Sequence, residues 1–388
     1  MRPHRGDVIR VDSVQHIAPL RSVVKSPAGC ANRGQAKPAS DYLRCLTADR
    51  PAASPKLTEF RLLKTAWRSS EADKHISVLV FQKTVKVITF LSVKGGVGKT
   101  TLTVNTANEL AERVGGSEKV LIIDLDAQAG ATVYVLGHKQ QEDLEKKGRT
   151  AYELLRSTLK GIKEAGEAPD PEKFIVGAGG DWSSRLYLLP GDSRIMAIER
   201  EVVAEAAAGG FGWFALLRQL LPKLRDSGYS YVFIDPPAAF GALARMALAA
   251  ADYFVVPIVP DDFGRVSFRM FVSDFFNEAA WQIKLSGRDE LPLCGGVVFN
   301  RIDSRSSKHE SIASSIAKEV SRSKLYGKYP IPVYESRLHD YIAYVLSLEK
   351  HKPLSKMKSE GKKAVEEFAS YFNEFYEYVV RDKVKNLG

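Results

Sequence analysis

Cysteine and long apolar runs are scarce in this 388-residue sequence. Its three cysteines are too few and too widely spaced for a disulfide framework or a Cys-x-x-Cys metal site; they are Cys30, Cys45 and Cys294. The most apolar segment, residues 240–260, is interrupted by Arg245 and Asp252, so no membrane-spanning run is expected. Residues 1–10 lead into no apolar segment typical of a secretory signal. These absences favour a protein of the reducing cytoplasm.

Acidic residues are scarce near the N-terminus. Of the net charge of +10, residues 1–84 carry +8, with 15 Lys+Arg against 7 Asp+Glu. Residues 33–55 are rich in Pro, Ala and Ser, and an apolar period first appears at residues 57–67, where it predicts one short amphipathic helix. The composition of residues 1–84 predicts a basic, disordered extension. A DNA-binding arm is one alternative, and a reading frame whose translation begins near Val85 is another.

A glycine-rich loop at residues 94–101 is the most informative motif. It reads Lys-Gly-Gly-Val-Gly-Lys-Thr-Thr, a variant of the Gly-x-x-x-x-Gly-Lys-Ser/Thr pattern with Val93 at the place of the first glycine. A strand-like stretch at residues 86–92 precedes the loop and a helical pattern at residues 101–113 follows it, which places an anion at a helix N-terminus. Lys99 is expected at the β/γ-phosphates and Thr100 at Mg²⁺. The full set of expected nucleotide-binding loop residues is Gly95, Gly96, Val97, Gly98, Lys99, Thr100 and Thr101.

Short apolar strands alternate with helical patterns from the loop onward. The predicted strands are residues 86–92, 119–124, 186–189, 231–235, 253–258 and 296–300, and the predicted helices are residues 101–113, 150–159, 214–225, 241–250, 268–281 and 310–322. This alternation predicts an α/β fold of the P-loop NTPase type, with a mostly parallel twisted sheet covered by helices on both faces. We expect one domain over residues 85–388, ending in an aromatic amphipathic helix at residues 362–384.

Carboxylates end two of the predicted strands. Asp124 and Asp126 follow one apolar run, and Asp235 ends another. Beside a phosphate loop, an aspartate that ends a buried strand is expected to hold Mg²⁺ directly or through water. An aspartate that caps the next turn is the alternative, and spacing alone leaves the role of Asp126 open.

The order of these motifs resembles the ParA family of deviant-Walker ATPases, which segregate DNA. The resemblance rests on the loop at residues 94–101, on Asp124-Leu125-Asp126-Ala127-Gln128, on Ile234-Asp235-Pro236-Pro237 and on residues 250–258, and it extends from about Val85 to about Val380. It implies ATP and Mg²⁺ as cofactors and slow, partner-stimulated hydrolysis.

The resemblance also implies roles for individual residues. Lys94 would reach across an ATP-sandwiched homodimer to the partner's phosphates, as an arginine finger does. Asp126 would orient the attacking water, Asp235 would be the Walker B carboxylate, and Asn300 would contact adenine. Two residues, Ala127 and Pro236, depart from the family pattern. We expect nucleotide binding to be retained and the rate of hydrolysis to be the property that changes.

The same resemblance implies non-specific DNA binding by a nucleoid-associated protein, with release stimulated by a ParB-like centromere-binding partner. Phosphate contacts would make this binding steeply salt-dependent. Each basic residue taken singly can equally be a solvated surface charge. The candidate contacts are Lys284, Arg288, Arg301, Arg305, Lys308, Arg322 and Lys324.

Two other functions compete with DNA partitioning. One is a MinD-like or cargo-positioning ATPase that acts on a membrane or a protein scaffold. Residues 381–388 contain too few apolar anchors for an amphipathic membrane helix, so no stable membrane association is expected. The other is a nucleotide-binding switch that barely hydrolyses ATP. Iron–sulfur reductases of the same fold need cysteines that this chain lacks at corresponding positions.

Overall fold

The described part of the chain falls into two units. The structure, a computed structural model, describes residues 60–66, 77–164, 166–207, 214–285, 287–288, 290–322 and 329–387. The units are Met1–Thr84 and Val85–Gly388. Within the described residues, no helix is long and apolar enough to cross a membrane.

A two-stranded hairpin is the described part of the first unit. Strand β1 (Phe60–Ala66) pairs antiparallel with β2 (Ser77–Lys83), with Phe60 opposite Lys83. The predicted helix at residues 57–67 is therefore wrong over β1. The β-branched and apolar residues of β2 favour a strand that pairs with this segment. The cross-strand pairing outweighs the weak helical period of residues 57–67. The disorder expected for the rest of residues 1–84 falls on residues outside those described.

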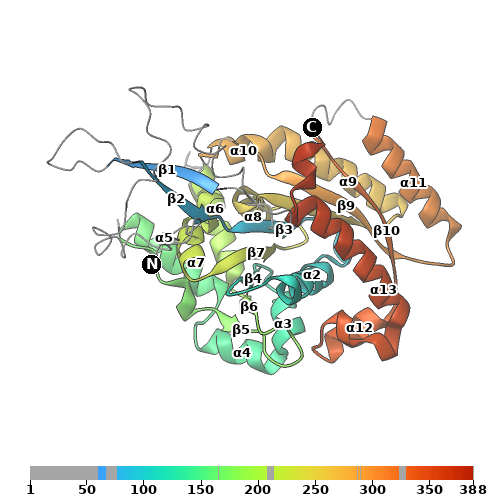
Figure 1. The fold of residues 1–388 in the computed structure, drawn as a ribbon, viewed down its shortest axis with the longest axis horizontal. Helices are drawn as coiled ribbons and strands as arrows, with labels where there is room; N and C mark the ends of the chain where they lie inside the picture. The colour runs from blue at the N-terminus through green and yellow to red at the C-terminus, as the bar shows by residue number, and fades with distance from the viewer. Residues whose placement is uncertain are drawn as a thin grey trace, which may run out of the picture. The chain divides into compact units, whose positions relative to one another are not determined.

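An eight-stranded sheet organises the second unit (Figure 1). The strand order is β10-β9-β8-β3-β7-β4-β6-β5, and each neighbouring pair is parallel except β5 with β6. The strands are β3 (Lys86–Phe90), β4 (Lys119–Asp124), β5 (Val176–Gly177), β6 (Leu186–Leu189), β7 (Tyr229–Asp235), β8 (Tyr253–Ile258), β9 (Leu293–Ile302) and β10 (Val333–His339). All six predicted strands are present, which confirms the predicted fold class.

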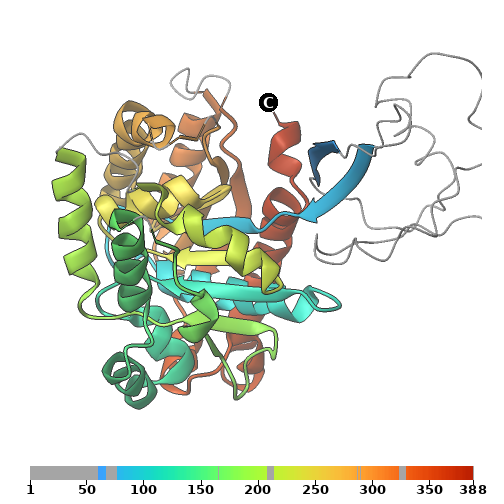
Figure 2. The same ribbon diagram turned by 90° about the vertical axis from the view of Figure 1, so that its left-hand side faces the viewer.

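The strands are apolar on both faces. Along β4, Val120 and Ile122 are buried in one core cluster, whereas Leu121 and Ile123 are buried in the other. Successive side chains of a strand point to opposite faces, so a continuous apolar run requires helices on both sides. Figure 2 shows the sheet between its two helical layers.

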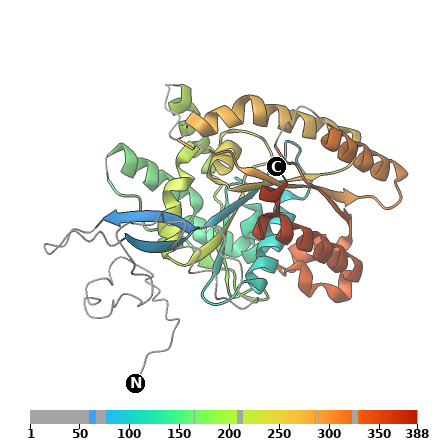
Figure 3. The same cartoon turned by 45° about the horizontal axis from the view of Figure 1, so that its top comes forward.

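Two groups of helices cover the sheet. On the Leu121 face lie α5 (Ala151–Lys163), α6 (Ile195–Ala207), α7 (Leu221–Asp226), α8 (Ala242–Ala250), α9 (Asp262–Asp274), α10 (Ala280–Leu285) and α11 (Ser307–Arg322). On the Val120 face lie α2 (Lys99–Arg113), α3 (Gly130–Leu136), α12 (Ile342–Glu349) and α13 (Lys358–Phe375), while α4 (His138–Lys146) follows α3 with Leu144 buried. Figure 3 shows α9 to α11 on one side of the sheet and α12 and α13 on the other.

The predicted aromatic helix packs into the core. In α13 the side chains of Phe368, Tyr371, Phe372 and Phe375 are buried, and the Tyr371 hydroxyl lies 3.0 Å from Oγ1 of Thr106 in α2. Helix α13 continues into a π-helical turn at Tyr376–Val380. The aromatic face therefore stabilises the domain that carries the phosphate loop.

We expect Gly296→Ala to destabilise the domain strongly. Gly296 has a φ of 155°, and a Cβ there would lie 2.0 Å from Cε1 of the buried Tyr334. Overpacking of this kind costs about 1–3 kcal/mol, and the strained backbone adds to the cost, so the melting temperature should fall by about 5–10 °C. Differential scanning calorimetry measures this change.

Gly177→Ala is the matched control, because a Cβ at Gly177 meets nothing within 4 Å. It should leave the melting temperature within about 1 °C. Equal melting temperatures for the Gly296→Ala variant and the wild type would contradict this account of β9.

Candidate functional site

The phosphate loop joins β3 to α2 at the carboxyl end of the sheet. Gly96 and Gly98 have left-handed φ values of 73° and 85°, which glycine adopts without strain. Gly98 is the N-cap of α2, and among the described contacts no side chain caps this helix. A Cβ at Gly98 would lie 2.3 Å from Nδ2 of Asn300, so the position also requires glycine for space. The uncapped N–H groups of α2 are therefore available to an anion.

Lys99 and Asp235 form a buried ion pair beside this loop. Nζ of Lys99 lies 2.7 Å from Oδ1 of Asp235, and the two side chains are 6% and 0% exposed. The Thr100 hydroxyl donates to Oδ2 of the same carboxylate at 2.8 Å, and Oγ1 of Thr103 lies 3.2 Å from Oδ1. Buried charges persist only when they are paired and hydrogen-bonded, and this network meets both conditions.

These groups fit a nucleoside phosphate with Mg²⁺. The uncapped N-terminus of α2 and the buried Lys99 ammonium supply positive potential for phosphate oxygens. The Thr100 hydroxyl and the Asp235 carboxylate meet at the end of β7, and oxygen ligands of these types suit Mg²⁺. The donor set therefore agrees with the predicted cofactors.

Asp124 ends β4 directly opposite Asp235 in the neighbouring strand. Its Oδ2 accepts hydrogen bonds from N of Thr132 at 2.9 Å and from Oγ1 of Thr132 at 2.7 Å. Burial, followed by the negative charge of Asp235, raises the pKa of Asp124 to about 7. Asp124 thus anchors the start of α3, and its carboxyl faces the protein interior.

Asp126 lies on the loop between β4 and α3. Its Oδ1 accepts from N of Gln128 at 2.9 Å. The loop then turns through Ala129, whose φ of 50° is left-handed, into α3. Gly130, the first residue of α3, lies against Thr100, because a Cβ at Gly130 would be 3.6 Å from Cγ2 of Thr100. The loop that carries Asp126 therefore borders the Thr100 side of the site.

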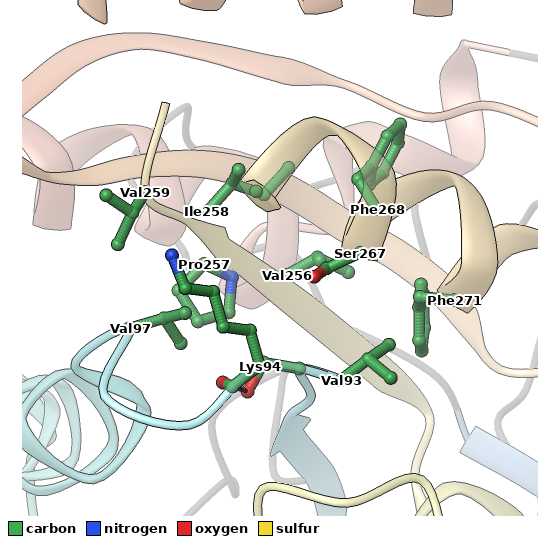
Figure 4. Close-up of a pocket in the computed structure, with 12 residues that line it drawn as sticks. Val93, Lys94, Val97, Val256, Pro257, Ile258, Val259, Ser267, Phe268 and Phe271 are labelled. Carbon is green, nitrogen blue, oxygen red and sulfur yellow. Dashed lines mark hydrogen bonds between the residues drawn. The ribbon is translucent and has the colours of Figure 1, made fainter. Parts of the chain in front are cut away.

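Lys94 pairs with a different carboxylate from Lys99. Nζ of Lys94 lies 2.7 Å from Oδ2 of Asp261, the N-cap of α9, and 5.9 Å from the ring centroid of Phe263. Figure 4 shows the Lys94 side chain extending from the phosphate loop towards the segment that follows β8. Burial would raise the pKa of Asp261, but hydrogen bonds from Lys94 and from the Gly264 N–H outweigh it and hold the pKa below its ordinary value.

A small pocket borders this lysine. Loop residues 92–94 and Val97 form one wall, β8 with Val259 forms a second, and Ser267, Phe268 and Phe271 of α9 form a third (Figure 4). The pocket thus joins the phosphate loop to α9.

Asn300 and Arg301 hold the phosphate loop from β9. Nδ2 of Asn300 donates to the carbonyl of Val97 at 2.7 Å, and Nη1 of Arg301 donates to the carbonyl of Gly96 at 2.7 Å. Nη2 of Arg301 also contacts Oδ2 of Asp340 at 3.1 Å. Both side chains bind loop carbonyls here, so Arg301 supports the loop while its side chain stays half exposed.

The remaining DNA-contact candidates occupy several different environments. Arg305 and Lys308 lie on the surface at the start of α11, paired with Asp303 and Asp262, and Lys284 is exposed on α10. The guanidinium of Arg288 instead contacts the carbonyls of Ala249 and Ala251 and Oδ1 of Asp252, and the side chain is 13% exposed. The structure therefore gives Arg288 a packing role. The side chain of Arg322 and all of Lys324 lie outside the described residues.

Two site residues escaped the sequence analysis. Thr103 contacts the Asp235 carboxylate one helical turn after Lys99, at a spacing that places both on one face of α2. Asp261 contacts Lys94, and the only sequence signal for it is an acidic residue between an apolar strand and a helix, which is the usual place of an N-cap. Its ion pair joins residues that are 167 positions apart, which no local pattern predicts.

The fold and the site together define a P-loop nucleotide-binding protein. A family model described as an AAA domain matches residues 85–275. The chromosome partitioning protein ParA of Caulobacter vibrioides is 28% identical over 234 residues, which cover 60% of this chain and 75% of that relative. The chromosome-partitioning ATPase Soj of Thermus thermophilus is 31% identical over 175 residues, 45% of this chain and 55% of the relative. The chain belongs to the ParA family.

Solved structures share the same fold. The structure of Cyanothece apo McdA has a TM-score of 0.57 and 19% identity, over 76% of this chain and 98% of that one. A putative plasmid partition protein of Borrelia burgdorferi bound to AMPPNP has a TM-score of 0.51 and 19% identity, over 76% of this chain and all of the other. At these identities the likeness concerns the fold.

We expect the Lys99–Asp235 pair to show strong coupling in the nucleotide-free protein. Asp235→Ala leaves the Lys99 ammonium buried without its counter-charge and should lower the free energy of unfolding by about 3–5 kcal/mol. The double variant Lys99→Met/Asp235→Ala removes both charges and should lose about 1–3 kcal/mol less than the sum of the single losses. Urea denaturation of the four proteins measures the coupling.

Glu142→Ala is the control, because Glu142 pairs with Lys146 on the surface and both side chains are more than half exposed. It should change stability by less than about 0.5 kcal/mol. Additive losses in the Lys99/Asp235 cycle would contradict the buried pair.

Proposed function

We propose that this protein is an ATP-dependent DNA-partitioning ATPase. ATP closes a sandwich dimer, the dimer binds DNA non-specifically, and a ParB-like partner stimulates hydrolysis and release. The observation that carries the proposal is the pair of lysines in one loop. Lys99 pairs with Asp235 and serves the phosphate site of its own subunit. Lys94 pairs instead with Asp261 at the start of α9 and is not needed at that phosphate site. Relatives named as partitioning proteins support the same role.

In the proposed reaction each side chain has a separate task. The N–H groups of α2 and the Lys99 ammonium bind and orient the β/γ-phosphates. The Thr100 hydroxyl and the Asp235 carboxylate hold the magnesium ion, which neutralises charge on the phosphates when bound. Asp126, on the loop beside Thr100, orients the attacking water.

Lys94 completes the site of the other subunit. An ammonium near the oxygen that joins the β- and γ-phosphates would stabilise the negative charge that develops on ADP as the terminal phosphoryl group is transferred to water. Its supply from the partner makes hydrolysis depend on the dimer. Asn300 is buried beside the loop, and the proposed contact with the adenine ring requires its hydrogen bond to the Val97 carbonyl to be exchanged.

Slow hydrolysis follows from the loop that carries Asp126. Ala127 replaces the proline of the family pattern, so the backbone before the left-handed Ala129 is not fixed at one φ. A water-orienting carboxylate on such a loop spends less time in the reactive position. Stimulation by a partner then amounts to ordering this loop.

A membrane-bound cargo-positioning role is supported less well. The C-terminal segment packs against the core, because Val380 and Val384 are buried. Leu387 is the one exposed large apolar side chain among residues 376–387. Such a segment lacks the exposed apolar face that binds a bilayer surface.

The DNA switch gives a direct test. Bound to an immobilised non-specific duplex, the protein should be retained with ATP and Mg²⁺ and should wash off with ADP. Arg305→Ala/Lys308→Ala should weaken binding and lower the slope of log K against log salt by about 2, because two phosphate contacts are lost. Surface plasmon resonance over a salt series measures both effects.

The control removes two exposed basic residues from another part of the surface. Lys146→Ala/Lys147→Ala lies on α4 and its C-cap, and both lysines are paired with acidic neighbours as Arg305 and Lys308 are. It should leave the slope unchanged. Equal retention with ATP and with ADP would overturn the proposed switch.

A further inference from the structure

Lys94 is held inside its own subunit by a residue on another element. Its Nζ lies 2.7 Å from Oδ2 of Asp261, and the two side chains are 32% and 31% exposed. The ring of Phe263, which is 74% exposed, lies beside the same ammonium. The contact joins the phosphate loop to the first turn of α9. It also occupies the Lys94 ammonium, which in the proposed dimer binds the phosphates of the other subunit.

The carboxylate of Asp261 is fixed by its own helix. Its Oδ1 accepts from N of Gly264 at 2.5 Å, which is an N-cap hydrogen bond. Gly264 packs so closely that a Cβ there would lie 1.9 Å from the carbonyl oxygen of Val259. Asp261 therefore cannot follow Lys94 out of the loop without losing the cap. Movement of Lys94 to another anion has to break the ion pair.

We infer that Asp261 is a positioning residue that retains Lys94 in the single subunit, so that dimerisation requires exchange of this carboxylate for the partner's phosphates. The inference rests on the proposed ATP-sandwiched dimer. It adds a restraint on that dimer, because each subunit gives up one ion pair when the sandwich closes. The restraint raises the protein concentration at which ATP drives dimerisation.

The expected size follows from the exposure of the pair. Partly exposed ion pairs change an equilibrium constant by about 1.4- to 5-fold. Two such pairs open for each dimer, so the factors multiply. Removal of the restraint should therefore lower the dimer dissociation constant by about 2- to 25-fold.

Asp261→Asn separates the restraint from the cap. Asparagine caps helices about as well as aspartate, so α9 keeps its N-terminal hydrogen bond while the negative charge is lost. We expect a melting temperature within about 2 °C of the wild type and a dimer dissociation constant in ATP and Mg²⁺ lowered 2- to 25-fold. Sedimentation velocity over a concentration series measures the constant.

Asp262→Asn is the matched control. Its carboxylate is the next along the chain and pairs with Lys308 on the surface at 2.7 Å, away from Lys94. It should leave the dimer constant unchanged. Amine labelling of the nucleotide-free protein, read by mass spectrometry, adds a second measurement, in which Lys94 should react several-fold faster in Asp261→Asn than in the wild type.

The outcomes separate this inference from the proposed function. A wild type that stays monomeric with ATP at every concentration overturns the sandwich dimer and the restraint with it. A wild type that dimerises, with an Asp261→Asn constant that is equal or higher, overturns the restraint alone. An unchanged rate of Lys94 labelling in Asp261→Asn would also overturn the restraint. If Asp261→Asn weakens the helix cap, its melting temperature falls. The test is then repeated with Asp261→Ser, which also supplies a capping oxygen.

Discussion

The buried ion pair between Lys99 and Asp235 is the constraint on which the rest of the site depends. It joins the first residue of α2 to the last residue of β7, and so it holds the phosphate loop against the carboxyl end of the sheet. Two buried charges persist only with their hydrogen bonds intact, and Thr100 and Thr103 supply these. The same groups are those that a magnesium–phosphate complex would use. Pairing among the chain's own residues thus holds the site together.

Charge in the loop is divided between two lysines with separate carboxylates. Lys99 is buried and faces Asp235, while Lys94 is a third exposed and faces Asp261. Pairing each ammonium with its own carboxylate reduces the repulsion between the two positive charges of the loop. This difference in exposure agrees with the roles proposed for the two lysines. A buried lysine binds its own ligand, and an exposed one can exchange partners at modest cost.

The sequence predicts those parts of the structure that local patterns encode. Continuous apolar strands such as β4 and the loop at residues 94–101 carry their own signals, and their position at one sheet edge follows from parallel topology. Strand β10 was missed because three consecutive polar residues, Glu335 to Arg337, interrupt its apolar pattern, and because it pairs with β9 through register shifts. The contacts of Asp261 and Arg301 were missed because they depend on long-range packing. The sequence predicts Arg288 as a candidate DNA contact, whereas its guanidinium contacts the carbonyls of Ala249 and Ala251, which is again a matter of long-range packing.

The central claim is that Lys94 acts on the nucleotide of the other subunit, and mixing two inactive variants tests it most directly. Lys94→Ala subunits lack only the lysine, and Asp126→Ala subunits keep the lysine but lack the carboxylate that is proposed to orient water. Mixed dimers then contain one complete site. The account predicts that each variant alone hydrolyses little ATP and that an equal mixture recovers up to about one quarter of the wild-type rate. A mixture that forms mixed dimers yet is no more active than its separate components would contradict it.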